Sequence, residues 1–341
     1  VCNRSGQGCW RTRGDPPRDL PVQDVGRIIE SEKSAGARLF GILGGEPLLY
    51  PHLFELLERH ADCYFQVFTN GTLLDDDTAA FFRRAGNVTP LISIEGDEAV
   101  SDERRGGKNV HERTMEAVDA CRRHGLITGV ATSVCASNID YVATDAFIDA
   151  LVARGVHYLW YYIYRPVGGR PNPELALSAE QILELRRFLV TARTRKPLVI
   201  IDAYWDHNGR AICPAATGIS HHVSPDGVVE PCPPIQFGCD SLCGASEVSR
   251  TLSASEFLAG FRQYASATTR GCVLLEDPEG LAAFMQRTGA RDTSGRGTGH
   301  RELAAMTVHA GHHQPGHEIP EKHWFYRLAK KHWFFGFGTY G

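Results

Sequence analysis

Short apolar runs alternate with amphipathic helical patterns through the first part of the chain. The runs that predict β-strands are residues 39–43, 65–68, 91–94, 128–134 and 158–164. Apolar residues at helical spacing, such as those around Val25–Ile29 and Ile182–Leu189, predict helices between them. Strand, helix and strand in regular succession are typical of βαβ units and of a parallel sheet buried on both faces. The pattern therefore predicts an α/β fold.

The alternation ends near residue 205, where cysteine, glycine and proline become frequent and Ser224–Gly227 reads as a turn between extended stretches. We therefore predict two domains, residues 1–205 and residues 206–341. The sequence opens at Val1-Cys2 without a methionine. We expect an absent N-terminal piece that carries a first strand, which would bring the number of strands to six.

Composition narrows the class of protein. The chain has 341 residues, of which 43% are hydrophobic and 22% charged, as in a folded globular protein. The formal net charge is −4 without a block of like charges, so we expect no nucleic-acid partner. No apolar run approaches the roughly 20 residues of a membrane helix and no signal-peptide pattern opens the chain, so we expect no membrane partner and a cytoplasmic location. Ten cysteines are too sparse for a disulfide scaffold and favour metal or redox chemistry.

Candidate ligand-binding residues follow the predicted strands. Cys2 and Cys9 are spaced like the outer cysteines of a C-x3-C-x2-C loop, and Gly6 stands where the middle cysteine would be. The segment Gly44-Gly45-Glu46-Pro47 follows the strand at 39–43. Later strands end near Asn70, Ser93, Glu95 and Ser133. Because the carboxyl ends of parallel strands meet at one edge, these residues should share a rim.

This order of motifs resembles the radical S-adenosylmethionine (SAM) superfamily. The resemblance implies a partial (β/α)6 barrel in which three loop cysteines hold a 4Fe-4S cluster. It also implies S-adenosylmethionine as a cofactor, a flavodoxin- or ferredoxin-type electron donor, and a peptide or small-molecule substrate. The reaction implied is reductive cleavage of S-adenosylmethionine to a 5'-deoxyadenosyl radical, which abstracts a hydrogen atom from the substrate.

The same resemblance assigns roles to individual residues. Glu46 is the foremost cofactor contact, Arg105 in the stretch 102–106 would pair with the ligand carboxylate, and Trp10 would lie near the adenine. The cofactor-binding residues implied are Trp10, Gly44, Gly45, Glu46, Pro47, Asn70, Ser93, Glu95, Arg105 and Ser133, with Cys2 and Cys9 as metal ligands.

Gly6 bears on the predicted activity and not on the predicted fold, because glycine has no side-chain atom that can bind iron. Three explanations remain: a cysteine-to-glycine change in an otherwise active sequence, a natural pseudoenzyme, or a cluster with a foreign ligand. The intact remaining motifs favour the first. The rival class is a non-catalytic binding protein that keeps the barrel without the radical cluster.

Further cysteines mark the second half. Cys213 and Cys232 resemble the opening of the auxiliary-cluster extensions called SPASM and twitch. Gly227 and Cys232 form the Gly-x4-Cys pattern that closes this pair. The C-x2-C-x5-C-x3-C run of full SPASM is absent. We predict one auxiliary iron-sulfur cluster on Cys213, Cys232 and Cys272, with Cys243 slightly preferred to Cys239 as a fourth ligand. The alternatives are a structural zinc site, and thus a zinc-binding α/β protein, or unliganded thiols.

Catalytic residues are less clearly marked. Tyr162, Tyr164 and Arg165 end the strand at 158–164, where they would contact substrate or manage a radical. Tyrosines in such a strand are more often part of the core.

Overall fold

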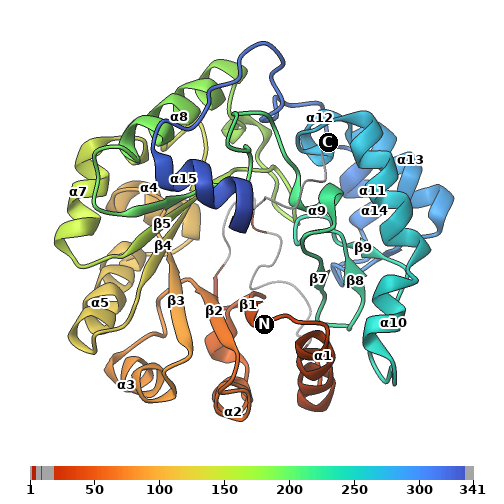
Figure 1. Ribbon diagram of the computed structural model, residues 1–341, viewed down its shortest axis with the longest axis horizontal. Helices are drawn as coiled ribbons and strands as arrows, with labels where there is room; N and C mark the ends of the chain where they lie inside the picture. The colour runs from red at the N-terminus through yellow and green to blue at the C-terminus, as the bar shows by residue number, and fades with distance from the viewer. Residues whose placement is uncertain (1, 5–8, 10–18, 335–341) are drawn as a thin grey trace.

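The computed structural model describes the chain except residues 1, 5–8, 10–18 and 335–341, so Gly6 and Trp10 lie outside the described residues. Six parallel strands form one sheet in the order β1-β2-β3-β4-β5-β6. Their bounds are β1 (Leu39–Ile42), β2 (Tyr64–Thr69), β3 (Val88–Ser93), β4 (Gly129–Val134), β5 (Tyr158–Ile163) and β6 (Val199–Ile201). The curved sheet with helices around its outside confirms the predicted α/β partial barrel (Figure 1).

One strand of this sheet was not predicted: β6 follows the helix after β5. The strand expected before Cys2 would lie outside the sequence and stays a prediction. The five strands that the sequence predicted all form, each within a few residues of its expected bounds. Residues on the inner face of the sheet, including Phe68, Leu91, Ala131, Trp160 and Ile201, pack together inside the barrel.

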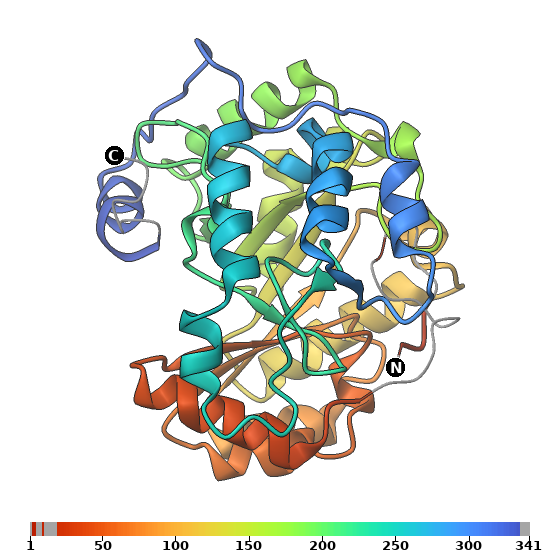
Figure 2. The same ribbon diagram turned by 90° about the vertical axis from the view of Figure 1, so that its right-hand side faces the viewer.

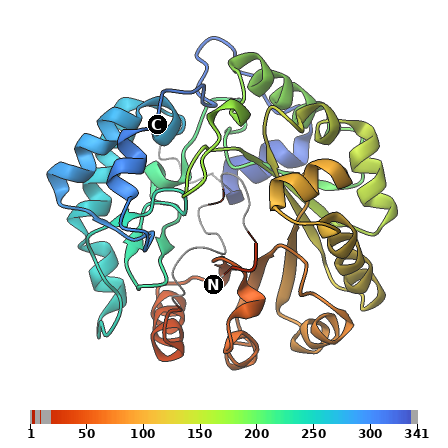
Figure 3. The same cartoon turned by 180° about the vertical axis from the view of Figure 1, so that it is seen from behind.

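Helices on the outer face complete the βα units. They are α1 (Val22–Ser34), α2 (Leu53–Arg59), α3 (Asp76–Ala85), α4 (Glu98–Arg105), α5 (Val110–Arg123), α6 (Ile139–Val142), α7 (Asp145–Ala153) and α8 (Ala179–Ala192), with helical turns η1 (Pro47–Leu49) and η2 (Pro173–Leu175). Figure 3 shows most of them from behind, around the outside of the sheet.

Helix α4 was missed because its surface is polar over most of its length. The Asp97 side chain accepts a hydrogen bond from the Val100 amide and begins the helix, and Gly106 ends it in the left-handed region at φ 64°. Arg105, expected in a loop, therefore lies in the last turn of a helix.

The second half is built from short hairpins and helices that lie across from the sheet (Figure 2). Its elements are α9 (Pro214–Thr217), β7 (His222–Val223), β8 (Val229–Glu230), β9 (Phe237–Gly238), α10 (Val248–Ser253), α11 (Glu256–Thr268), α12 (Val273–Glu276), α13 (Pro278–Thr288), β10 (Arg291–Asp292), α14 (Gly299–Ala304), α15 (Trp324–Ala329) and η3 (Lys330–Phe334). The predicted turn joins β7 to β8, closed by a bond from the Gly227 amide to the Ser224 carbonyl.

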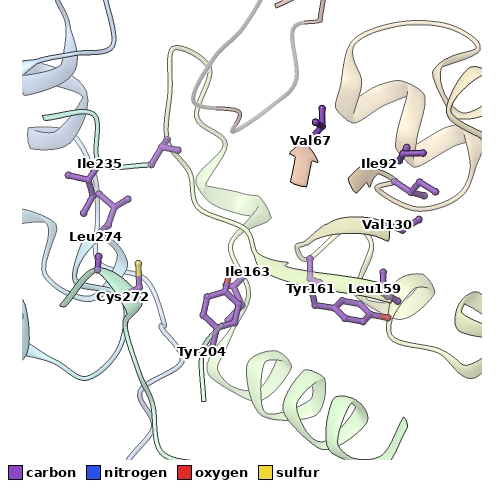
Figure 4. Close-up of a cluster of buried hydrophobic side chains, with 14 of the residues drawn as sticks. Val67, Ile92, Val130, Leu159, Tyr161, Ile163, Tyr204, Ile235, Cys272 and Leu274 are labelled. Atoms are coloured by element: carbon purple, nitrogen blue, oxygen red, sulfur yellow. Dashed lines mark hydrogen bonds between the residues drawn. The ribbon is translucent and has the colours of Figure 1, made fainter. Parts of the chain in front are cut away.

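Two separate parts of the second half contact the barrel. Ser249, in α10, hydrogen-bonds to Ser31 in α1 at 2.7 Å between hydroxyl oxygens. Near the other end, the Tyr326 hydroxyl accepts a bond from the Ile200 amide of β6. Apolar side chains of both halves belong to one buried core (Figure 4), so the two halves pack as one body.

Candidate functional site

A cavity of about 400 Å³ lies between the carboxyl ends of the strands and the second half of the chain. This volume is within the usual range for small-molecule sites. Of the predicted site residues, those on its wall are Cys2, Cys9, Gly44, Gly45, Asn70, Ser93, Glu95, Arg105, Ser133, Tyr162, Arg165, Cys213, Cys232 and Cys272. Apolar side chains such as Phe68, Val167 and Phe261 cover much of the remainder.

The loop after β1 lines the cavity with two glycines, Gly44 and Gly45, so its main chain is exposed there without side chains. Gly44 has φ 138°, which side-chain-bearing residues rarely adopt, and a Cβ at this position would meet nothing within 4 Å. The open space at Gly44 thus faces the cavity, where a ligand could approach the main chain closely.

Glu46, which was predicted as the foremost cofactor contact, braces this loop and is not among the residues that line the cavity. Its carboxylate accepts bonds from the Thr69 hydroxyl at 2.7 Å, the Asn70 amide at 2.8 Å and the Leu48 amide at 3.2 Å. Burial raises the pKa of Glu46 against the effect of these donors. Its acceptor capacity is used to tie β1 to β2, and Pro47 beside it is buried outside the cavity wall.

Glu95 forms a buried charged centre with two neighbouring arginines. The guanidinium of Arg104 donates to the Glu95 carboxylate at 2.7 Å, and Arg105 donates to its other oxygen. Burial alone would raise the pKa of Glu95, but the two guanidinium groups outweigh burial and lower it. Arg105 is therefore paired within the chain, where the resemblance implied a ligand carboxylate.

The N-terminal cysteines lie at the same cavity. The side chain of Asn70 donates to Asn3 at 2.8 Å, and Asn3 donates to Thr72 at 3.2 Å, so the end of β2 holds the residue next to Cys2. Burial raises the pKa of the Cys2 thiol. Cys2 and Cys9 supply two thiols, and Gly6 adds none.

Three further thiols line the opposite wall. Cys213 and Cys272 each precede a short helix, α9 and α12, and Cys232 lies in a tight turn in which the Ile235 amide donates to its carbonyl. Burial raises the pKa of Cys213 to about 11 and that of Cys232 further. Deprotonation by a bound metal would overcome this effect of burial.

The arrangement of these thiols bears on the kind of metal. Within the described ranges, no three His, Cys, Asp or Glu side chains converge closely enough to hold a single metal ion. A 4Fe-4S cluster binds each thiolate through a different iron, so it suits ligands that share a cavity without meeting at one point. Three thiols on one cavity wall are a donor set of the kind that holds a 4Fe-4S cluster, and thiolates also bind zinc.

Two further predicted residues lie away from the cavity. Cys243 is exposed, and its thiol contacts the Asp226 carbonyl at 3.4 Å beside Gly227, so it does not join the other three cysteines. Spacing along the chain could not show that its loop turns outward. Tyr164 is buried behind the wall, where the Asn172 amide donates to its hydroxyl.

Sequence reasoning missed several residues of the site. Arg104 and Tyr204 line the cavity, and Asn138 donates to the carbonyls of Glu95 and Ser133. The arginine pair at 104–105 was a visible signal, but only the helical geometry of α4 places both side chains on Glu95.

Comparison with known proteins agrees with this arrangement. The family model of the radical SAM superfamily matches residues 1–143. The N-terminal part of the chain is a radical SAM superfamily domain. Members of this superfamily are enzymes that use S-adenosylmethionine and a 4Fe-4S cluster.

Individual relatives are distant. AdoMet-dependent heme synthase of Methanosarcina barkeri is 29% identical over 168 residues, which cover 48% of each chain. GTP 3',8-cyclase of Parasynechococcus marenigrum is 29% identical over 168 residues, 46% of this chain and 47% of the cyclase. The chain thus spans about half the length of these curated relatives.

Solved structures share the fold. Streptococcus suis SuiB bound to S-adenosylmethionine has a TM-score of 0.64 at 16% identity, covering 81% of this chain and 68% of SuiB. Native anSMEcpe with bound AdoMet has a TM-score of 0.60 at 16% identity, covering 76% of this chain and 79% of anSMEcpe. No helix among the described residues is long and apolar enough to span a membrane.

Proposed function

We propose that this chain carries the binding site of a radical SAM enzyme of the cytoplasm and holds S-adenosylmethionine in the cavity beside Gly44 and Gly45. The carrying observation is that the glycine loop, the polar strand ends and the cysteines of both halves share one wall. With a 4Fe-4S cluster held by a complete set of three cysteines, S-adenosylmethionine would supply a 5'-deoxyadenosyl radical. An external flavodoxin- or ferredoxin-type protein would supply the electron.

The chain's own residues bind and orient the ligand in this proposal. Gly44 and Gly45 leave room for the methionine end at the main chain, and Ser93 and Ser133 offer hydroxyl groups at the strand ends. Glu95 is held in its charged form by its arginine partners, which favours it as an acceptor for ligand hydroxyl or ammonium donors. The apolar lining excludes water from the reacting region.

The N-terminal cysteines do not fit the superfamily's 4Fe-4S cluster, because that cluster needs three thiol ligands and the loop supplies two. We propose that Gly6 is the single defect in an otherwise competent site. The variant Gly6→Cys should therefore bind more iron than the parent chain after anaerobic reconstitution. It should also produce 5'-deoxyadenosine with dithionite, whereas the parent chain should produce none. S-adenosylmethionine binding, measured by equilibrium dialysis, should be present in both.

The rival function is a non-catalytic binding protein, which the glycine at position 6 itself favours. That function would replace our proposal if Gly6→Cys bound both the cluster and S-adenosylmethionine but released no 5'-deoxyadenosine.

The second half would hold one auxiliary cluster through Cys213, Cys232 and Cys272. Replacing any of these by alanine should lower the iron and sulfide content, whereas the exposed thiols at Cys239 and Cys243 serve as matched controls whose replacement should not. Zinc without iron in the purified protein would instead identify the zinc-binding alternative.

For the substrate, we propose a peptide or a small molecule that enters the apolar part of the cavity. The related fold of SuiB has been solved bound to the precursor peptide SuiA, which supports testing a peptide first.

A further inference from the structure

Arg165 stands just past the end of β5 and points across the cavity to the second half of the chain. Its Nε donates to the Cys272 thiol at 3.2 Å, and its Nη1 donates to the Ile163 carbonyl at 3.1 Å. The guanidinium also lies over the Tyr204 ring, 5.6 Å from the centroid. Figure 4 shows Tyr204 beside Ile163, on the side that faces Cys272.

The position of Tyr204 is itself fixed, because the Ile163 amide donates to its hydroxyl at 2.9 Å. Arg165 is thus held by a carbonyl, by an aromatic ring and by a thiol. These contacts aim its Nε–H at a sulfur atom, which is an unusual partner for an arginine.

The charge on Arg165 has no carboxylate partner within the described residues. Three other arginines are paired with acids: Arg104 and Arg105 of the cavity wall with Glu95, and Arg193 of the core with Asp202. A cation on a largely apolar wall is costly without a counter-charge. The groups that face Arg165 are the thiols of Cys213, Cys232 and Cys272, which become anionic when they bind metal.

We infer that Arg165 is a positioning residue for the auxiliary cluster, supplying the positive charge and the sulfur-directed hydrogen bond that three thiolates require. The inference rests on the proposed auxiliary cluster. A 4Fe-4S core of charge 2+ with three thiolates carries a net charge of 1−, which one guanidinium neutralises. Hydrogen bonds to the sulfurs and net charge both set the potential of such a cluster, and here both raise it.

The test isolates the auxiliary cluster in the full chain by replacing Cys2 and Cys9 with alanine. After anaerobic reconstitution, this background should bind one cluster, and its midpoint potential is measured by EPR-monitored titration. Adding Arg165→Met should shift the potential to lower values and speed the loss of iron to a chelator. Arg165→Lys keeps the charge but not the Nε donor, so its potential should fall between the two.

Arg270→Met is the matched control, because Arg270 lies two residues before Cys272 but directs its Nε to the Ala211 carbonyl. The midpoint potential of the cluster in the Arg270→Met variant should equal that of the background. Iron lost from a folded Arg165→Met chain but kept in Arg165→Lys would also support the inference, since the charge alone would then retain the cluster.

Equal potentials for the background, Arg165→Met and Arg165→Lys would overturn the inference and leave the proposed cluster intact. A background that binds no iron would overturn the auxiliary cluster itself, and the inference with it, so the two failures are distinguishable.

Discussion

Gly44 combines a left-handed backbone with empty space where a side chain would be. Its φ of 138° excludes most residues for conformational reasons alone, without any steric neighbour. The same combination occurs at Gly36, between α1 and β1, with φ 104° and nothing within 4 Å of its Cβ position. Gly44 lines the cavity, whereas Gly36 does not.

Variants of Gly44 and Gly36 can distinguish an effect on stability from an effect on ligand binding. Both Gly44→Ala and Gly36→Ala should lower the free energy of unfolding in urea by about 1–3 kcal/mol through backbone strain. Only Gly44→Ala should also weaken S-adenosylmethionine binding, measured by equilibrium dialysis, because the added methyl group enters the ligand space. Equal binding by the two variants would show that the ligand does not approach this loop.

Glu46 shows how far the sequence can assign a residue. Its place after the strand at 39–43 was predictable, because buried strands are recognisable apolar runs. The direction of its carboxylate was not, since a strand-end glutamate can face a ligand or accept bonds from neighbouring loops. In the structure, the Thr69 hydroxyl and the Asn70 backbone amide donate hydrogen bonds to its carboxylate oxygens.

At the scale of elements, a buried ionic group joins residues 319–330 to the barrel. Asp202, after β6, accepts bonds from Arg193 at 2.5 Å and from Lys330 at 3.0 Å. Glu321 accepts from Arg186 at 2.7 Å and Arg193 at 2.6 Å. Three cations thus face two carboxylates, which gives the buried group a net positive charge.

Removal of one acid from this group should be costly. Asp202→Asn should lower the free energy of unfolding by about 3–5 kcal/mol, because buried cations lose their counter-charge. Asp149→Asn is the matched control: Asp149 pairs with Lys196 at 2.7 Å but is 61% exposed, so its loss should cost under about 1 kcal/mol. Urea unfolding followed by circular dichroism measures both, and similar costs for the two would contradict a buried role for Asp202.

The excess positive charge also predicts a pH dependence. Burial and the nearby arginines, against the attraction of Asp202 and Glu321, lower the pKa of Lys330 from 10.5 to about 8. Between these values the unfolded chain binds a proton that the folded chain has released, so the free energy of unfolding should rise with pH, by up to about 3 kcal/mol.

Lys330→Met should remove this rise, measured by urea unfolding at pH 7.5 and pH 10. An identical pH dependence in the two proteins would assign the effect to another group.

The elements that the sequence did not predict share a physical cause. Strand β6 has three residues, Val199–Ile201, too few for a pattern to emerge. Helix α4 has charged residues around most of its circumference and depends on its caps and on the Glu95 ion pairs. Elements defined by their own apolar periodicity were predictable, whereas those held mainly by tertiary partners were not.

For the whole molecule, the boundary predicted at residue 205 does not divide the core. Apolar residues on both sides pack together, and the Tyr326 hydroxyl satisfies the amide of Ile200 in β6. The partners of Arg186, Arg193 and Asp202 include Glu321 and Lys330 from beyond the boundary.

We therefore expect residues 1–205 expressed alone to aggregate and to lack cooperative thermal unfolding, in contrast to the full chain. Size-exclusion chromatography and circular dichroism test this. A monomeric fragment with a sharp unfolding transition would show that the barrel folds independently.

The ionic link between Asp202 and Lys330 also sets an order of events during translation. The ribosome adds Lys330 128 residues after Asp202, which takes about 6–25 s at about 5–20 residues per second. During that interval Arg186 and Arg193 have Asp202 as their acid but not yet Glu321. We therefore expect this seam to stay hydrated on the nascent chain until residues 319–330 dock against it.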